Sequence, residues 1–181
     1  TPIDYKQLLI GDKNAILIAA RILGYGSDYT FEYRGQKIDV NLSNIEDKPI
    51  DESLVLDGKN EFEFTLPTSK KEITFKFLTH EDEQKLSNEL KGLAKINKES
   101  SSELSTRMKY VITSINGDYD IKTIREFVDT SFLARDSREL RQYIKKIQPD
   151  VDLSFDYEDQ RGNVKVIDIP VGIKFFWPDA A

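Results

Sequence analysis

The sequence contains no cysteine, one histidine and one tryptophan in 181 residues. Without cysteine, the chain can form neither a disulfide bond nor a thiolate metal site. No run approaches the roughly 18 consecutive apolar residues of a membrane-spanning helix, so no membrane partner is expected. Glycine and proline, at nine and six residues, are too scarce for a fibrous or low-complexity chain.

The rest of the composition is that of a folded protein. Hydrophobic residues make up 39% of the chain and charged residues 32%, which is enough for one domain with a packed core. The formal net charge of -6 gives no general attraction to nucleic acid, and we expect none as a partner. The chain starts at Thr1 without Met, which indicates that an upstream segment is missing.

The first part of the chain has helical periodicity. Thr1-Pro2 favours a helix start, and this short helix is expected to end near Gly11. Asp12 is expected to cap a second helix, and Gly24 to end it in the left-handed conformation. The apolar residues on one face of that second helix are Ile16, Leu17, Ala20 and Leu23.

Three pairs of segments alternate between apolar and polar residues, as strands with one buried face do. Each pair is predicted to form a hairpin, because turn-forming residues separate its two halves. The pairs are residues 29–33 with 38–42 around Arg34-Gly35-Gln36, 62–66 with 73–77 around Pro67–Lys70, and 153–157 with 164–169 around 159–163.

The stretch between the second and third hairpins is predicted to be helical. Thr79 and Asp82 favour the start of a helix over about 80–96, and the polar residues 97–102 are expected to form a loop. Further helices are predicted over about 103–115, 120–130 and 136–148. Pro149 ends this block, because proline cannot continue the helical hydrogen bonds.

These predictions give an α+β fold in one domain that covers residues 1–181. We expect a helical body and a β lobe, with an aromatic tail at the C-terminus. The expected ranges are about 1–28 and 79–149 for the helical body, about 29–78 and 150–174 for the β lobe, and 175–181 for the tail.

No group of residues points to catalysis, and we expect neither enzyme activity nor a cofactor. His80 lies at the start of a charged helix, and no Gly-x-Ser-x-Gly motif accompanies it, so an exposed helix-start residue is the better interpretation. Gly24-Tyr25-Gly26 follows a helix, whereas a dinucleotide-binding loop follows a strand. The acidic run 150–159 lacks the spacing of a calcium loop and is expected to be a solvated strand edge.

Two features are candidates for binding a protein partner. Phe175, Phe176 and Trp177 cannot all point inward from a strand, so the tail either closes the core with Trp177 or docks on a partner. Arg135, Arg138 and Arg141 lie at near-helical spacing, with Lys145 and Lys146 after them. Asp136 and Glu139 are expected to pair with these cations within the helix, leaving a ridge that faces solvent or a protein.

Several stretches together resemble the baseplate hub proteins of contractile-tailed bacteriophages of the T-even type. The resembling stretches occur in the expected order over nearly the whole chain, and they are Pro2–Tyr29, Leu66-Pro67 with Phe77-Leu78-Thr79, Ala134–Ser137 with Leu140-Arg141, Pro149–Asp152 and Phe176-Trp177-Pro178. The resemblance implies a non-catalytic protein of the virion tail, assembled in the host cytoplasm. It implies other tail proteins as partners, in a symmetric or multi-copy assembly.

The resemblance also implies a small lobe like a zinc ribbon. Many members of the family carry one cysteine pair where this chain has the Tyr33–Lys37 turn and another near Tyr157–Gly162. Because this chain has no cysteine, we expect the two hairpins to meet through packing and strand pairing and no metal. Two other functions stay open: an assembly chaperone absent from the mature virion, and a hydrolase that acts during cell entry.

Overall fold

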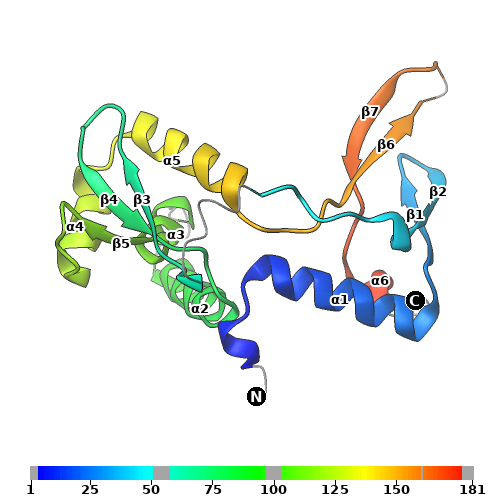
Figure 1. Ribbon diagram of the computed structural model, residues 1–181, viewed down its shortest axis with the longest axis horizontal. Coiled ribbons are helices and arrows are strands. Elements are labelled where there is room, and N and C mark those ends of the chain that lie inside the picture. The colour runs from blue at the N-terminus through cyan, green and yellow to red at the C-terminus, as the bar shows by residue number, and fades with distance from the viewer. Residues whose placement is uncertain (1–3, 51–57, 97–102, 160, 177–181) are drawn as a thin grey trace. The chain divides into compact units, whose positions relative to one another are not determined.

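The computed structural model describes residues 4–50, 58–96, 103–159 and 161–176 (Figure 1). It shows a mixed α+β protein, as the sequence predicts. The chain divides into two compact units. We call Thr1–Ile10 with Ile50–Gln148 the helical unit, and Gly11–Pro49 with Pro149–Ala181 the hairpin unit. No helix among the described residues is long and apolar enough to cross a membrane.

The units differ from the predicted body and lobe in two elements. The 62–75 hairpin lies in the helical unit, because its apolar face packs on the helices there. The first long helix lies in the hairpin unit, where Ile18 belongs to the same buried cluster as Phe31 and Ile167. Alternation and helical periodicity indicate that a face is buried, but they do not tell which elements cover it.

The helical unit contains a three-stranded antiparallel sheet with strand order β3-β4-β5. Its elements are a 3-10 helix η1 at Tyr5–Gln7, β3 Phe62–Thr65, β4 Glu72–Phe75, α2 His80–Ile96, α3 Glu103–Val111, β5 Ile112–Ile115, α4 Ile121–Thr130 and α5 Ala134–Ile147. Along β3 and β4, Phe62, Ile73 and Phe75 are buried against the helices while their neighbours Glu63 and Glu72 are exposed. Burying a side chain such as Phe75 contributes roughly 1.5–3 kcal/mol to folding.

The predicted helix over 103–115 is wrong in its last four residues. Helix α3 ends at Val111, and Ile112–Ile115 form β5, which pairs with β4. Three of these four residues are β-branched, and a strand partner lies beside them, which favours the extended conformation. Asn116 and Gly117 then turn the chain with positive φ angles of 51° and 81°.

The hairpin unit holds two separate two-stranded sheets and the helices that cover them. Its elements are α1 Ile10–Tyr25, β1 Asp28–Tyr33, β2 Gln36–Asn41, a 3-10 helix η2 at Leu42–Asn44, β6 Ser154–Glu158, β7 Val164–Asp168 and α6 Ile173–Phe176. Its core includes Leu42, 1% exposed, and Phe175, 0% exposed. The predicted first and third hairpins are therefore confirmed.

Helix α1 does not begin or end where the sequence indicates. It starts at Ile10 and runs through Gly11, so Asp12 lies in its first turn and does not cap it. Gly11 is required by packing, because a Cβ there would lie 2.1 Å from the carbonyl oxygen of Pro149. At the other end the left-handed residue is Gly26, with φ 82°, and its N–H donates to Ile22 O at 2.9 Å. Gly24 stays helical.

The two hairpins of this unit meet near their turns. Tyr33 of β1 and Tyr157 of β6 pack edge to face with ring centroids 5.2 Å apart. The Tyr157 hydroxyl donates to the Gln36 side-chain oxygen. Because β1–β2 and β6–β7 stay separate sheets, side-chain packing joins them and the expected strand pairing between them is absent from the described strands. The likeness to a zinc ribbon stays a prediction.

Candidate partner-binding site

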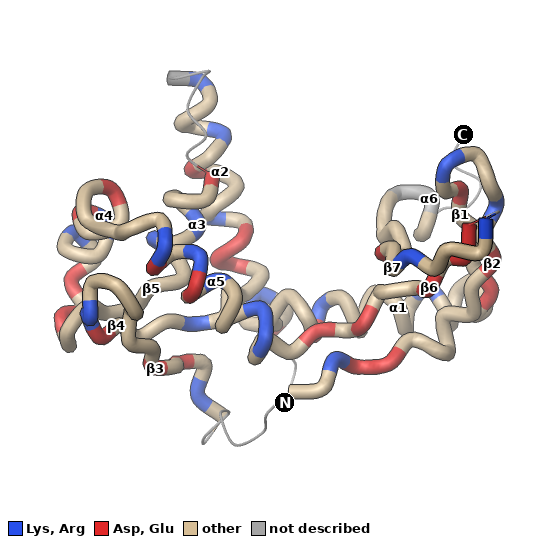
Figure 2. Tube along the Cα trace, turned by 90° about the horizontal axis from the view of Figure 1, so that it is seen from above, with Lys and Arg blue, Asp and Glu red and all other residues tan. Residues whose placement is uncertain are grey.

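Helix α5 carries five exposed cations. They are Arg135, Arg138, Arg141, Lys145 and Lys146. Figure 2 marks Lys and Arg along the chain in blue and Asp and Glu in red. None of the five forms an ion pair with a carboxylate in the part of the chain that the structure describes. The Arg141 guanidinium only donates to the carbonyl of Ser137, at 3.2 Å. We call these five residues the α5 ridge.

Of the two acidic residues of α5, Asp136 is turned away from the ridge, whereas Glu139 is half-buried. Asp136 is 0% exposed and accepts hydrogen bonds from the backbone N–H of Thr68 at 2.7 Å and of Ser69 at 3.0 Å. The predicted pairing of Asp136 with arginines in its own helix is therefore wrong. A carboxylate at this position satisfies two amides of the β3–β4 turn, which sequence spacing within one helix cannot reveal.

Burial acts to raise the pKa of Asp136, but the hydrogen bonds from Thr68 and Ser69 outweigh it and hold the pKa below its usual value. The charged form is thus the one that the fold accommodates. After Asp136, apolar contacts hold α5 in place. Leu140 is 0% exposed, and the Tyr143 ring stacks on Phe64 at 5.0 Å. The ridge therefore projects from a firmly seated helix.

Of the three aromatic residues at the C-terminus, the structure describes Phe175 and Phe176. Phe175 is 0% exposed, and its ring packs edge to face on Tyr29 at 4.9 Å. The prediction that Phe175 binds a partner is therefore wrong, because its ring is packed into the core of the hairpin unit. Phe176 is half-buried against Phe175 at 4.9 Å. Trp177 lies outside the described residues.

Sequence reasoning missed Arg21, whose buried guanidinium organises this region. It is 5% exposed and donates to three backbone carbonyls, those of Phe175 at 2.7 Å, Gly26 at 2.9 Å and Asp28 at 3.4 Å. Its guanidinium also lies 4.9 Å from the ring centroid of Tyr25. The only signal in the sequence is one arginine within the apolar stretch Ala15–Leu23. That signal gives no indication of what the side chain binds.

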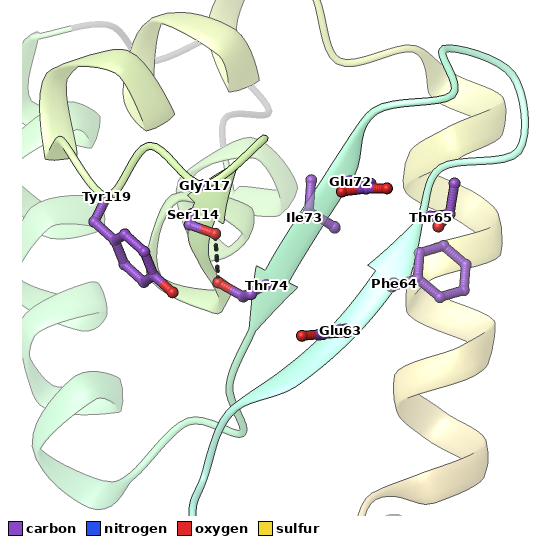
Figure 3. A pocket seen from close by; sticks show the side chains of 9 residues that line it. All are labelled: Glu63, Phe64, Thr65, Glu72, Ile73, Thr74, Ser114, Gly117 and Tyr119. Carbon is purple, nitrogen blue, oxygen red and sulfur yellow. Dashed lines mark hydrogen bonds between the residues drawn. The ribbon is translucent and has the colours of Figure 1, made fainter.

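A cavity of about 310 Å³ opens on the outer face of the β3–β4–β5 sheet (Figure 3). Glu63, Glu72 and Tyr119 line it, and at its floor Thr74 Oγ1 donates to Ser114 Oγ at 2.7 Å. Both carboxylates are exposed, whereas the acid of a glycoside hydrolase lies in apolar surroundings that keep it protonated. The cavity therefore offers hydrogen bonds to a polar ligand. It does not provide the apolar surroundings that keep such a catalytic acid protonated.

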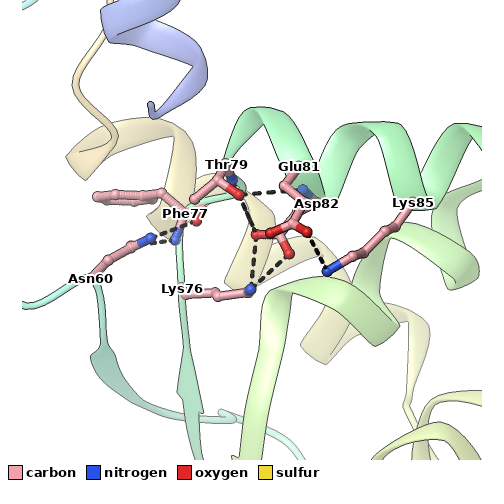
Figure 4. A network of polar contacts seen from close by, with 7 residues as sticks. All are labelled: Asn60, Lys76, Phe77, Thr79, Glu81, Asp82 and Lys85. Atoms are coloured by element: carbon pink, nitrogen blue, oxygen red, sulfur yellow. Dashed lines mark hydrogen bonds and ion pairs between the residues drawn. The ribbon is translucent and has the colours of Figure 1, made fainter. Parts of the chain in front are cut away.

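The start of α2 forms the capping arrangement that the sequence predicts (Figure 4). Thr79 Oγ1 accepts from Asp82 N at 3.2 Å, and Asp82 Oδ2 accepts from Thr79 N at 3.1 Å. Lys76 Nζ adds an ion pair at 2.8 Å. Burial acts to raise the pKa of Asp82, but the bonds from Lys76 and Thr79 outweigh it and lower the pKa. These contacts fix the start of α2.

His80 follows this cap as the first residue of α2 and is half-buried. Its ring packs against Tyr5 at 4.5 Å, and its Nε2 hydrogen-bonds to the Gln84 side chain at 3.0 Å. Within the described ranges, no three His, Cys, Asp or Glu side chains gather as metal ligands. In the acidic run, Asp159 caps its own turn by accepting from Arg161 N at 2.9 Å and Asn163 N at 3.0 Å.

No protein-family model, curated protein or solved structure matches this chain.

Proposed function

We propose that this protein is a non-catalytic component of a bacteriophage tail baseplate hub. It binds neighbouring tail proteins during assembly in the host cytoplasm and remains in the virion in a fixed number of copies. The α5 ridge is the observation that carries this proposal, because five exposed cations that form no ion pair within the described ranges fit the acidic surface of another protein. Nucleic acid is a poorer fit, since the chain as a whole has a net charge of -6.

The stretches that resemble hub proteins give independent support, because they contact one another in pairs. Asp136, in the stretch Ala134–Ser137, holds the turn that follows Leu66-Pro67. Asn14 Nδ2 donates to Asp150 Oδ1 at 3.2 Å and so joins the Pro2–Tyr29 stretch to Pro149–Asp152. Residues that support each other in space are expected to occur together in proteins of one fold, and contacts of this kind are what a fold shared with hub proteins would require. None of these contacts is a catalytic arrangement.

Quantitative mass spectrometry of purified virions tests the proposal. The chain should be present at a fixed ratio to a known tail protein, near the ring symmetry of the baseplate. The same measurement on virions stripped of loosely bound protein by high salt is the control for contamination. If virions lack the chain but cannot form without its gene, it is an assembly chaperone. If virions form normally without the gene, the tail proposal is overturned.

A further inference from the structure

Strand β1 has one free edge, and its register shows which residues face outward there. The turn between β1 and β2 contains only Arg34 and Gly35, both with positive φ, so Tyr33 and Gln36 form its closing hydrogen-bonded pair. Hydrogen-bonded and non-bonded pairs alternate along an antiparallel ladder. By this alternation Ser27 and Leu42 should form a hydrogen-bonded pair, and Leu42 N does donate to Ser27 O at 2.8 Å.

The backbone amides and carbonyls of Thr30 and Glu32 therefore point away from β2, along the free edge. The carbonyl of Asp28 points the same way and accepts from Arg21 at 3.4 Å. No strand of the described chain pairs with this edge, because the sheet holds β1 and β2 alone. A row of unpaired N–H and C=O groups is a template for another extended backbone.

A groove of about 530 Å³ runs beside this free edge of β1. It is lined by consecutive residues Tyr29–Glu32, by Lys37, and on the other side by Pro170, Gly172 and Phe175. Tyr29, Phe31 and Phe175 are at most 7% exposed and provide an aromatic floor. The Tyr29 hydroxyl donates to Pro170 O at 3.0 Å and so ties the two sides together. The volume is within the ordinary range of ligand sites, about 300–1,000 Å³.

We infer that this groove binds an extended polypeptide segment of a partner, which adds to the free edge of β1 as a further strand. The segment's backbone bonds to Thr30 and Glu32, and one apolar side chain rests on the aromatic floor. Glu32 and Lys37 lie directly opposite each other on neighbouring strands, so the charged rim is neutral overall. An uncharged segment is therefore complementary to it. This binding mode uses backbone bonds for affinity and a pocket for specificity.

The chain offers a matched pair of variants for the test. Thr30→Pro removes a backbone N–H that faces the groove and leaves the hydrogen bonds between β1 and β2 intact. Proline is tolerated at such edge positions. Asp39→Pro alters the residue opposite Thr30, whose N–H faces the other edge of the hairpin. Both variants lose the same side-chain bond, from Thr30 Oγ1 to Asp39 Oδ1 at 2.6 Å. Only the first variant blocks strand addition at the groove.

The probe is a random linear peptide library, selected on the intact chain and resynthesised as single peptides. Selected peptides should be uncharged and alternate apolar residues. They should bind Thr30→Pro roughly tenfold more weakly or worse, and Asp39→Pro as well as the unaltered chain. Methylating alternate backbone nitrogens of the peptide should weaken binding to the unaltered chain by a similar factor, which tests strand addition even if Thr30→Pro fails to fold.

Three results would overturn the inference. One is a selection that yields no binding peptide. Another is equal binding by both proline variants, which would mean that the groove takes an apolar group without pairing a strand. The third is binding that does not depend on the peptide's backbone N–H groups. None of these results bears on the presence of the chain in virions, so the baseplate proposal stands or fails separately.

Discussion

At the scale of single residues, Asp136 shows how one buried carboxylate can join two elements. It belongs to α5, yet its two oxygens accept from backbone amides of the β3–β4 turn, 68 and 67 residues earlier in the chain. Without it, these amides would lose their charged partner. The seating of the α5 ridge therefore depends on a residue that contributes no charge to the exposed face.

Replacing Asp136 with alanine should lower the free energy of unfolding by about 2 kcal/mol, because two hydrogen bonds to a charged, buried carboxylate are lost. Urea denaturation followed by circular dichroism measures the change. Glu126→Ala is the matched control, since it removes an exposed carboxylate from the neighbouring helix α4 and should change stability by less than about 0.5 kcal/mol. Equal effects of the two variants would contradict this role.

At the scale of elements, Glu89 connects three helices of the helical unit. It lies on α2, and both its oxygens accept from the Arg125 guanidinium of α4 at 2.8 Å. The Tyr110 hydroxyl of α3 donates to the same carboxylate at 2.8 Å. The hydrogen bonds from Arg125, partly opposed by burial and assisted by Tyr110, lower the pKa of Glu89 to about 2. The helices are thus held by a bidentate pair as well as by apolar packing.

The pH dependence of stability should report this contact. The folded pKa of Glu89 lies below the unfolded value of about 4.3, so the stabilisation is complete above that value and is lost as the pH falls toward about 2. Because the side chain is 23% exposed, we expect about 1–2 kcal/mol and not the full value of the shift.

The measurement compares the unaltered chain with Glu89→Gln by urea denaturation at several pH values from about 5 to about 2.5. The difference between them should shrink as the pH falls. Glu81→Gln is the control, because Glu81 forms a more exposed ion pair with Lys85 in the same helix. That variant should change stability by less than about 0.5 kcal/mol at every pH. A constant difference for Glu89→Gln would contradict the expectation.

At the scale of the whole molecule, charge is distributed unevenly. Acidic residues outnumber basic ones by 32 to 26, yet the five charged side chains of α5 that are fully exposed are all basic. Random distribution of surface charge would intersperse the two signs along such a helix. A ridge of one sign steers and orients an oppositely charged partner, and its effect weakens as salt screens it.

Reversing the ridge should remove the chain from virions. The triple variant Arg135→Glu, Arg138→Glu, Arg141→Glu should fold, because all three side chains are exposed, but incorporation should fall roughly tenfold or more. The control reverses three exposed lysines, Lys91, Lys95 and Lys122, and so makes the same change in net charge. Quantitative mass spectrometry of virions gives the readout. Equal incorporation of both variants would show that the ridge is not the contact surface.

Much of the secondary structure followed from local pattern. The three hairpins, the capped start of α2 and the basic face of α5 all depend on residues within a few positions of one another. The exceptions each involve a distant partner. Ile112–Ile115 form a strand because β4 lies beside them, and position 11, inside α1, must be glycine because Pro149 packs against it.

The candidate sites divide in the same way. Spacing alone put Arg135, Arg138 and Arg141 on one exposed face. It could not show that Phe175 closes a core, that Arg21 binds its carbonyl 154 residues away, or that β1 keeps a free edge beside an aromatic groove. Each of these depends on which segments meet in space.

The sequence by itself determined the α+β class, most of the helices and hairpins, and the absence of any thiolate chemistry. It could do so because periodicity, caps, turns and composition are local or global properties of the chain. Only the tertiary structure decided the division into two units, the burial of Phe175 and Asp136, and the groove along β1. These depend on hydrogen bonds and packing between residues far apart in sequence, and no local pattern specifies them.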